Sequence, residues 1–131
     1  MIVVDSNVVA HLYLPGGFTA AAEKLLRREP DWAAPLLWRS ELRNILALYM
    51  RKGLLSFERS FEIQREAEAL LADNEYDVDS FDVLELARDS GCTAYDCEFV
   101  ALAKRLNVKL VTSDAKLRKA FPTLTAPLSG G

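Results

Sequence analysis

The sequence predicts an α/β fold, a three-layer α/β/α sandwich around a short parallel sheet. Short apolar runs alternate with longer segments of helical periodicity, as in strands linked by crossover helices. The first run, Ile2 to Val4, is continuous and β-branched, which is typical of a strand buried on both faces. The 131 residues show no internal repeat or linker, so we expect one domain over residues 1–128 and a flexible tail at 129–131.

Proline and glycine divide the N-terminal part of the chain into elements. Pro15-Gly16-Gly17 breaks the first helix, Pro35 stops the second strand, and Gly53 is the C-terminal stop of a long helix. The expected elements are a strand at 2–4, a helix at 7–14, a helix at 19–28, a strand at 31–34 and a helix at about 36–52.

Hydroxyl side chains mark the helix starts in the C-terminal part. Ser56, Ser80 and Thr93 each precede a helical pattern and are expected to be N-caps. The segment VKLVT at 108–112 is the most strand-like stretch after the N-terminus. The expected elements are a helix from 57 to about 74, a strand at 76–78, a helix from 80 to 91, a helix at 94–106, a strand at 108–112, a helix at 114–120 and an edge strand around Leu124.

Composition places the chain among globular proteins. Half of its residues are hydrophobic and 27% are charged. No apolar run approaches the roughly 18 residues of a membrane span, and the N-terminus lacks a secretory signal pattern, so we expect a cytoplasmic protein with no membrane segment. Cys92 and Cys97 are too few for a zinc site and fit reduced core thiols. Because the net charge is −3, any nucleic-acid contact has to rely on local positive charge.

Two acids follow predicted strands. Asp5 comes directly after the first strand, and Asp114 follows VKLVT through Ser113. In open parallel sheets, sites form outside the carboxyl ends of the strands. An unpaired carboxylate beside a buried strand is expensive to desolvate, so Asp5 is a helix cap, an ion-pair partner or part of a site. Asp114 has a similar alternative, as a cap of the last helix.

A third acid lies within the long third helix. Glu41 falls on one stripe with Leu37, Ile45 and Leu48, at helical spacing. Because the other members of that stripe are apolar, we expect the stripe to face the core and Glu41 to need a partner there.

A fourth acid, Asp96, shares a helix face with Phe99, Val100 and Ala103. The alternative is a capping box with Thr93, in which the carboxylate returns to the N-cap amide.

Four carboxylates directed at one place would repel one another strongly, and a bound divalent cation would relieve that repulsion. Hard cations such as Mg²⁺ or Mn²⁺ prefer oxygen ligands, and Mg²⁺ keeps several waters while using one or two carboxylates. The pattern therefore favours a divalent-metal site.

Other hydrolytic chemistries fit the residues poorly. The chain has a single histidine, His11, which excludes a two-histidine ribonuclease mechanism. No Gly-rich phosphate loop or nucleophile elbow is present. A receiver domain would want an acid pair after the first strand, where this chain has Ser6-Asn7 after its single acid.

The opening VVDSNVV, the helical Ser40-Glu41-Leu42, the segment AYDCEFVALAKRLNVKLVTSD and the intervals between the acids resemble PIN-domain proteins. They resemble most closely the VapC-type toxins of bacterial toxin–antitoxin pairs, over nearly the whole chain. The resemblance implies a parallel α/β/α sandwich, a divalent-metal-dependent endoribonuclease, inhibition by a cognate VapB-type antitoxin, and a homodimer. Cys97, where the family often has a small residue, departs from the pattern, and the segment 54–76 carries no recognisable motif.

The resemblance also assigns residues. Asp5, Glu41, Asp96 and Asp114 match the family's acidic quartet, and Asn7, Thr112 and Ser113 match the polar residues that support it. We predict that Asp5 and Asp96 bind the metal most directly, while Glu41 and Asp114 orient the attacking water or complete a second metal site. The metal would activate that water for in-line hydrolysis of the RNA phosphodiester.

Substrate and partner contacts are predicted from charge and apolar content. Arg39 and Arg43 flank Glu41 and are the candidates for binding RNA, with solvated helix faces as the alternative. Large apolar residues between 32 and 57 form either a groove for an antitoxin helix or core. An inactive PIN-like module that binds RNA or protein is the alternative function.

Overall fold

A five-stranded, wholly parallel sheet forms the middle of the computed structural model, which describes residues 1–128. The predicted tail at 129–131 lies outside the described residues. The strand order is β3-β2-β1-β4-β5, so the N-terminal strand is central. The strands are β1 (Ile2–Val4), β2 (Trp32–Pro35), β3 (Glu75–Tyr76), β4 (Leu110–Thr112) and β5 (Thr125–Pro127).

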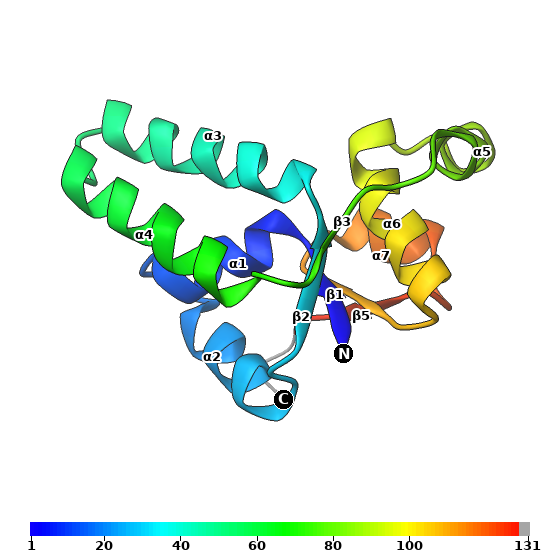
Figure 1. Ribbon diagram of the computed structural model, residues 1–131, viewed down its shortest axis with the longest axis horizontal. Helices are drawn as coiled ribbons and strands as arrows, with labels where there is room; N and C mark the ends of the chain where they lie inside the picture. Colours follow the sequence, from blue (N-terminus) through cyan, green and yellow to red (C-terminus); the bar gives the residue numbers. More distant parts are fainter. Residues whose placement is uncertain (129–131) are drawn as a thin grey trace.

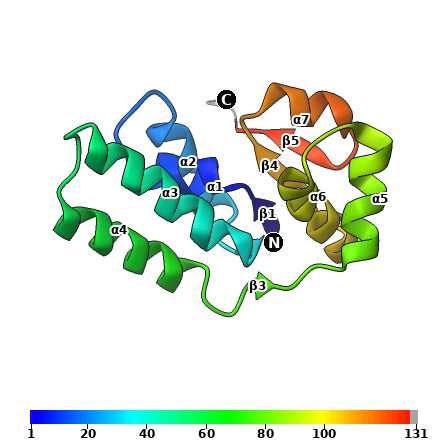
Figure 2. The same cartoon turned by 90° about the horizontal axis from the view of Figure 1, so that it is seen from above.

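Helices cover both faces of this sheet, which confirms the predicted three-layer α/β/α sandwich (Figures 1 and 2). The first layer contains the helices that follow β1 and β2, and the second contains those that follow β3 and β4. They are α1 (Ser6–Tyr13), α2 (Thr19–Arg28), α3 (Leu37–Arg51) and α4 (Phe57–Leu70) on one side, and α5 (Ser80–Ser90), α6 (Ala94–Leu106) and α7 (Ala115–Ala120) on the other.

The core lies between the central strands and their covering helices. Val3 and Val4 of β1 are fully buried, as expected for a strand enclosed on both faces. Trp32 and Trp38 are also fully buried, at the start of β2 and in α3. Helix α6 packs against β1, β2 and β4. The polar residues that follow β1 and β4 therefore continue directly from buried backbone.

The chain reverses its direction of travel across the sheet at β1. It runs outward from β1 to β2 and β3, then crosses the other face and returns as β4 on the opposite side of β1. The strand order therefore reverses between β1 and β4. At such a switch point the connections leave in opposite directions and open a crevice beyond the strand ends. Asp5 follows β1 at that position, and Asp114 follows β4.

Several predicted boundaries move by a few residues. Pro35 does not stop β2 but is its last residue, paired with Tyr76 of the short edge strand β3. Strand β3 covers only Glu75 and Tyr76, so it begins one residue earlier and ends two residues earlier than predicted. The N-cap of α5 is Asp79 and not Ser80, since the Asp79 carboxylate accepts the N–H of Asp82 at 3.2 Å.

Left-handed residues account for two further differences. Asn107 adopts φ 56° and ends α6, and the Val108 N–H still bonds to the Ala103 carbonyl, so β4 begins only at Leu110. Helix α4 stops at Leu70, and Asp73 turns the chain with φ 73°. The last helix and the edge strand also begin one residue late, at Ala115 and Thr125.

Two smaller predictions concern the cysteines and the membrane, and the single histidine can be placed beside them. Cys92 and Cys97 are free and buried, as expected for core thiols. His11 is partly buried on α1, with its ring centroid 4.9 Å from that of Phe18. In the described part of the chain, none of the helices combines the length and the apolar character that crossing a bilayer requires.

Candidate functional site

A cleft of about 390 Å³ lies at the switch point of the sheet. All four predicted acids line it: Asp5 after β1, Glu41 from α3, Asp96 from α6 and Asp114 after β4. The chain thus brings residues from four separate segments to one place. Helices α3 and α6, which lie on opposite faces of the sheet (Figures 1 and 2), both contribute side chains to its lining.

Asp5 has two roles in the local structure. One carboxylate oxygen accepts the Val8 N–H at 2.8 Å and caps α1, so the predicted cap is confirmed. The other oxygen accepts the Thr112 hydroxyl, from the end of β4. These bonds hold the carboxylate between the first turn of α1 and the end of β4, where it also lines the cleft.

The electrostatic environment of Asp5 disfavours its charge. Burial raises the pKa of Asp5, and the negative charges of Asp114 and Asp96 raise it further. The hydrogen bonds from Thr112 and Val8 act in the opposite direction but do not outweigh burial. Asp5 is therefore a carboxylate held in place by hydrogen bonds that would be stabilised by a nearby positive charge.

Glu41 is held by a residue that the sequence did not single out. The buried Ser6 hydroxyl donates to the Glu41 carboxylate at 2.7 Å. Burial raises the pKa of Glu41, the Ser6 bond lowers it, and the charges of Asp96, Asp5 and Glu98 raise it again. Glu41 and Asp5 are thus electrostatically coupled across the cleft, and the pKa of each is raised.

The stripe that contains Glu41 does not face the core, as the sequence pattern had suggested. Leu48 is 40% exposed, and Leu37 and Ile45 are only partly buried and line the cleft. The core-facing stripe of α3 is instead formed by Trp38, Leu42 and Leu46. Glu41 does have a partner, the Ser6 hydroxyl, but the prediction that it faces the core is wrong because it lines the cleft.

Asp96 and Asp114 both lie at helix starts. The Asp96 N–H donates to the Thr93 hydroxyl at 3.1 Å, which is one half of the predicted capping box. Asp114 caps α7 by accepting the N–H groups of Lys116 at 2.9 Å and Leu117 at 3.3 Å. Each of these two acids therefore belongs to the first turn or the cap of a helix that begins beside the cleft.

The predicted supporting residues differ in position. Thr112 is fully buried; its hydroxyl donates to Asp5 and accepts the Asp114 N–H at 3.0 Å, which joins the two strand-end acids. Asn7 is exposed and lines the cleft. Ser113 is partly buried beside the cleft but does not line it.

The two predicted RNA-binding arginines lie outside the cleft lining. Arg39 forms ion pairs with Glu75 at 2.6 Å and with Glu68 at 3.1 Å, which tie α3 to β3 and α4. Arg43 is exposed on α3. Along residues 1–128 the cleft is lined by no lysine or arginine at all.

The cleft contains four polar or aromatic residues that sequence reasoning missed: Ser6, Ser40, Asn44 and Tyr95. Their positions in the sequence, next to a predicted acid or one helical turn away from one, could have identified them. Ser6 and Tyr95 each neighbour a predicted acid in sequence, and Asn44 lies one helical turn beyond both Ser40 and Glu41.

The donor set fits a hard divalent cation. The charged groups that line the cleft are carboxylates, which are the ligands Mg²⁺ and Mn²⁺ prefer. Within residues 1–128, no three His, Cys, Asp or Glu side chains converge closely enough to hold an ion by themselves. Mg²⁺ does not require three converging side chains, because it uses one or two carboxylates and retains several waters.

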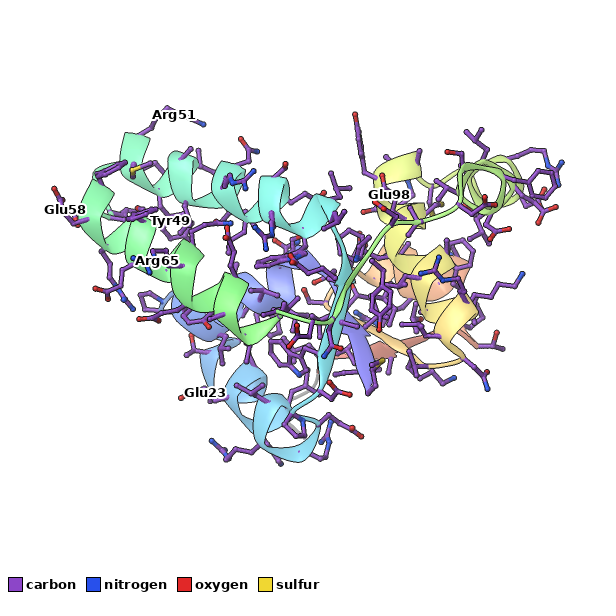
Figure 3. The ribbon with its side chains drawn as sticks, in the orientation of Figure 1. Glu23, Tyr49, Arg51, Glu58, Arg65 and Glu98 are labelled. Carbon is purple, nitrogen blue, oxygen red and sulfur yellow. The ribbon has the colours of Figure 1, made fainter. Side chains whose placement is uncertain are left out.

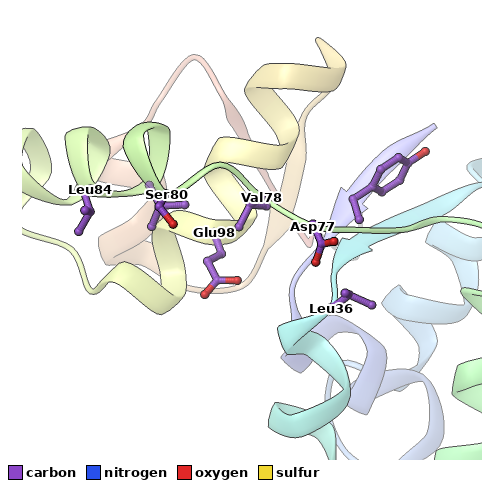
Figure 4. Close-up of a pocket in the computed structure, with 8 residues that line it drawn as sticks. Leu36, Asp77, Val78, Ser80, Leu84 and Glu98 are labelled. Carbon is purple, nitrogen blue, oxygen red and sulfur yellow. The ribbon is translucent and has the colours of Figure 1, made fainter.

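A second pocket of about 370 Å³ lies between the start of α3 and the segment that joins β3 to α5 (Figure 4). Its walls include Leu36, Val78 and Leu84, with the carboxylates of Asp77 and Glu98. Glu98 lies near the start of α6 (Figure 3), and burial raises its pKa. Because the charge of Glu98 also acts on Glu41, the negative potential of the cleft extends beyond the four acids.

Comparison with known proteins gives consistent matches. The family model of the PIN domain matches residues 2–121. Ribonuclease VapC3 from Pyrobaculum aerophilum is 32% identical over 130 residues, which is 96% of this chain and 98% of that protein.

Solved structures share the fold. The crystal structure of PAE2754 from Pyrobaculum aerophilum has a TM-score of 0.77 at 20% identity, covering 97% of this chain and 90% of that one. A toxin–antitoxin complex from Klebsiella pneumoniae has a TM-score of 0.74 at 15% identity, covering 98% of both. The PIN-like architecture expected from the sequence is confirmed. With a family model that spans most of its length, this chain belongs to the PIN-domain family.

Proposed function

We propose that this protein is a divalent-metal-dependent endoribonuclease, the toxin of a VapBC-type toxin–antitoxin pair. One observation carries the proposal: four carboxylates line one cleft at the switch point of the sheet, and none of the cleft-lining residues within 1–128 is basic. The 32% identity to Ribonuclease VapC3 supports the same activity. The alternative, an inactive PIN-like binding module, is disfavoured because all four acids are present and lie together.

The acids have different tasks in this proposal. Asp5 and Asp96 hold the cation, Mg²⁺ or Mn²⁺, and Asp5 is preoriented for this by its bonds to Val8 and Thr112. Glu41 and Asp114 orient the attacking water or hold a second ion. The bound cation supplies an activated water and neutralises charge that develops on the phosphate. Ser6 fixes the Glu41 carboxylate, so that its proton-accepting oxygen has a defined position.

The partner is a VapB-type antitoxin. The similarity to a Klebsiella toxin–antitoxin complex supports it. Of the large apolar residues between 32 and 57, Trp32, Trp38 and Leu46 belong to the core, whereas Leu54 and Phe57 are exposed around the turn between α3 and α4. Phe57 stacks with Phe61 at 6.3 Å, which adds a second exposed ring to this surface. The proposed pair acts in the cytoplasm, with the toxin as a homodimer. Co-purification with the neighbouring gene product tests the partner, and light scattering tests the dimer.

Cleavage of a mixed RNA pool in EDTA, Mg²⁺ or Mn²⁺ tests the activity, with wild type and Asp5→Asn compared. The expected result is cutting only with metal, reduced at least 100-fold by the substitution, since a metal contributes several kcal/mol at the transition state. Asp73→Asn is the matched control: it removes one carboxylate outside the cleft, at φ 73°, which Asn tolerates well. Absence of cutting with every metal, from folded protein free of antitoxin, would contradict the proposal.

A further inference from the structure

The cleft has to bind a polyanion without basic side chains in its lining. Acids, uncharged polar residues and apolar residues line it throughout the described part of the chain. Proteins that bind single-stranded nucleic acid usually combine positive charge along the backbone with aromatic rings on which bases stack. If the cation compensates only the scissile phosphate, the flanking nucleotides need contacts of another kind.

Tyr95 has the position and exposure for such a contact. It lies in the first turn of α6, directly before Asp96, and both residues line the cleft. Its side chain is 63% exposed, whereas Phe99, one turn later, is buried in the core. Burying large apolar surface stabilises a fold, and a ring this exposed contributes little of that kind. The ring is therefore available for contact beside the carboxylate of Asp96, one of the two proposed metal ligands.

The opposite wall of the cleft complements this ring. Ser40 and Asn44 lie one turn apart on α3, on either side of Glu41 in sequence, and both are exposed. Their hydroxyl and amide groups can donate to and accept from the edges of a base. A base between the two walls would have an aromatic surface on one side and hydrogen-bonding groups on the other.

We propose that Tyr95 is a substrate-binding residue that stacks against a base of the RNA next to the scissile phosphate. This inference rests on the proposed ribonuclease function and deepens it. Because every base has a π-face, the contact secures single-stranded RNA without selecting one base.

The test uses an RNA oligonucleotide that the wild-type protein cleaves, and compares Tyr95→Phe with Tyr95→Leu. Tyr95→Leu is expected to lower kcat/KM about tenfold, mainly through KM, and Tyr95→Phe to stay within about twofold of wild type. Phe81→Leu is the matched control: Phe81 is 70% exposed on α5 and does not line the cleft. Since both rings are exposed, thermal unfolding should be unchanged in each variant.

An abasic substrate identifies the nucleotide involved. Abasic sites are introduced singly on each side of the cleavage point. At the stacked position, the abasic site should reduce kcat/KM about tenfold for wild type and have little further effect in Tyr95→Leu. The Tyr95→Leu effect should also be similar at low and moderate salt, because stacking releases no counterions.

Three outcomes would overturn the inference. The first is cleavage by Tyr95→Leu with the wild-type KM, which leaves the ribonuclease proposal intact. The second is additivity of Tyr95→Leu with every abasic position. The third is a loss of kcat/KM that follows dissociation of a dimer in light scattering, which would assign Tyr95 to a protein interface. Failure of the ribonuclease proposal is recognised separately, because wild type itself would then cleave no RNA.

Discussion

Asp5 directly follows strand β1 and Glu75 lies in strand β3, and both acids are partly buried, yet their hydrogen-bond partners differ in kind. Glu75 of β3 accepts hydrogen bonds from Arg39 Nε at 2.6 Å, Arg39 Nη2 at 2.8 Å and Trp38 Nε1 at 2.7 Å, and these lower its pKa. Asp5, after β1, accepts bonds only from uncharged donors, and burial, together with the charges of Asp114 and Asp96, raises its pKa.

The difference separates a structural acid from a candidate functional one. At β3 the positive charge comes from the protein itself, because the Arg39 side chain pairs with Glu75 and connects α3 to the edge of the sheet. In the cleft the protein supplies hydrogen bonds that hold the carboxylates in place but no positive charge. Because burial and neighbouring charges raise the pKa of Asp5 and of Glu41, their ionised forms reduce the stability of the folded protein unless a cation comes from solution.

The largest expected effect is on catalysis. Asp96→Asn should lower metal-dependent RNA cleavage by on the order of 100-fold or more, because it removes one of the two proposed metal ligands. Cleavage rates at saturating Mg²⁺ and Mn²⁺ measure this. Full metal-dependent cleavage by Asp96→Asn would show that Asp96 is not a metal ligand. It would then contradict the claim that the cleft acids, unlike Glu75, are functional.

For the structural acid, Glu75→Gln should destabilise the fold by about 2 kcal/mol, because the charge-assisted pair of hydrogen bonds from Arg39 to the Glu75 carboxylate is lost. Urea unfolding measures it, and cleavage should fall far less than in Asp96→Asn. Asp89→Asn is the control, since Asp89 pairs with Arg88 on the exposed surface of α5. That change should have no measurable effect on stability. Equal stabilities of wild type and Glu75→Gln would contradict a structural role.

A smaller effect is expected in the pH dependence of the same pair. The pKa of Glu75 is lower in the folded state than in the unfolded one, so its contribution is fully present above the unfolded value of about 4.3. The contribution is lost as the pH falls through the folded pKa. The stability difference between wild type and Glu75→Gln should therefore shrink in acid. A difference that is constant from neutral pH into strong acid would exclude this linkage.

The sequence predicted the fold and the four acids because both follow from local patterns. Asp5 and Asp114 follow predicted strands, which the sequence alone shows. In the structure both cap the helix that comes next, as one alternative had it, and both line the cleft. Glu41 was found for a partly wrong reason, since apolar neighbours at helical spacing lined a cleft rather than the core.

Contacts between distant residues could not be predicted in this way. Arg39 was expected to bind RNA, but Glu75, its partner, is far away in sequence and reaches it only through the pairing of β3 with β2. The Ser6–Glu41 bond likewise depends on how α1 and α3 pack. Tyr95 was overlooked because nothing in a single sequence tells an exposed ring in a cleft from a buried ring in the core.

The most direct test of the account is thermal unfolding in EDTA and at increasing Mg²⁺ or Mn²⁺, with wild type, Asp5→Asn and Asp73→Asn compared. Wild type and Asp73→Asn should gain stability with metal, by about 2.7 kcal/mol at 100 times the dissociation constant. Asp5→Asn should have a stability similar to that of wild type in EDTA, because the loss of the buried charge offsets the altered bond to Thr112 and Asn still caps a helix; its response to metal should be weak. A wild type that is indifferent to both ions, or an Asp5→Asn variant that responds as wild type does, would contradict the claim that the cleft acids hold a cation.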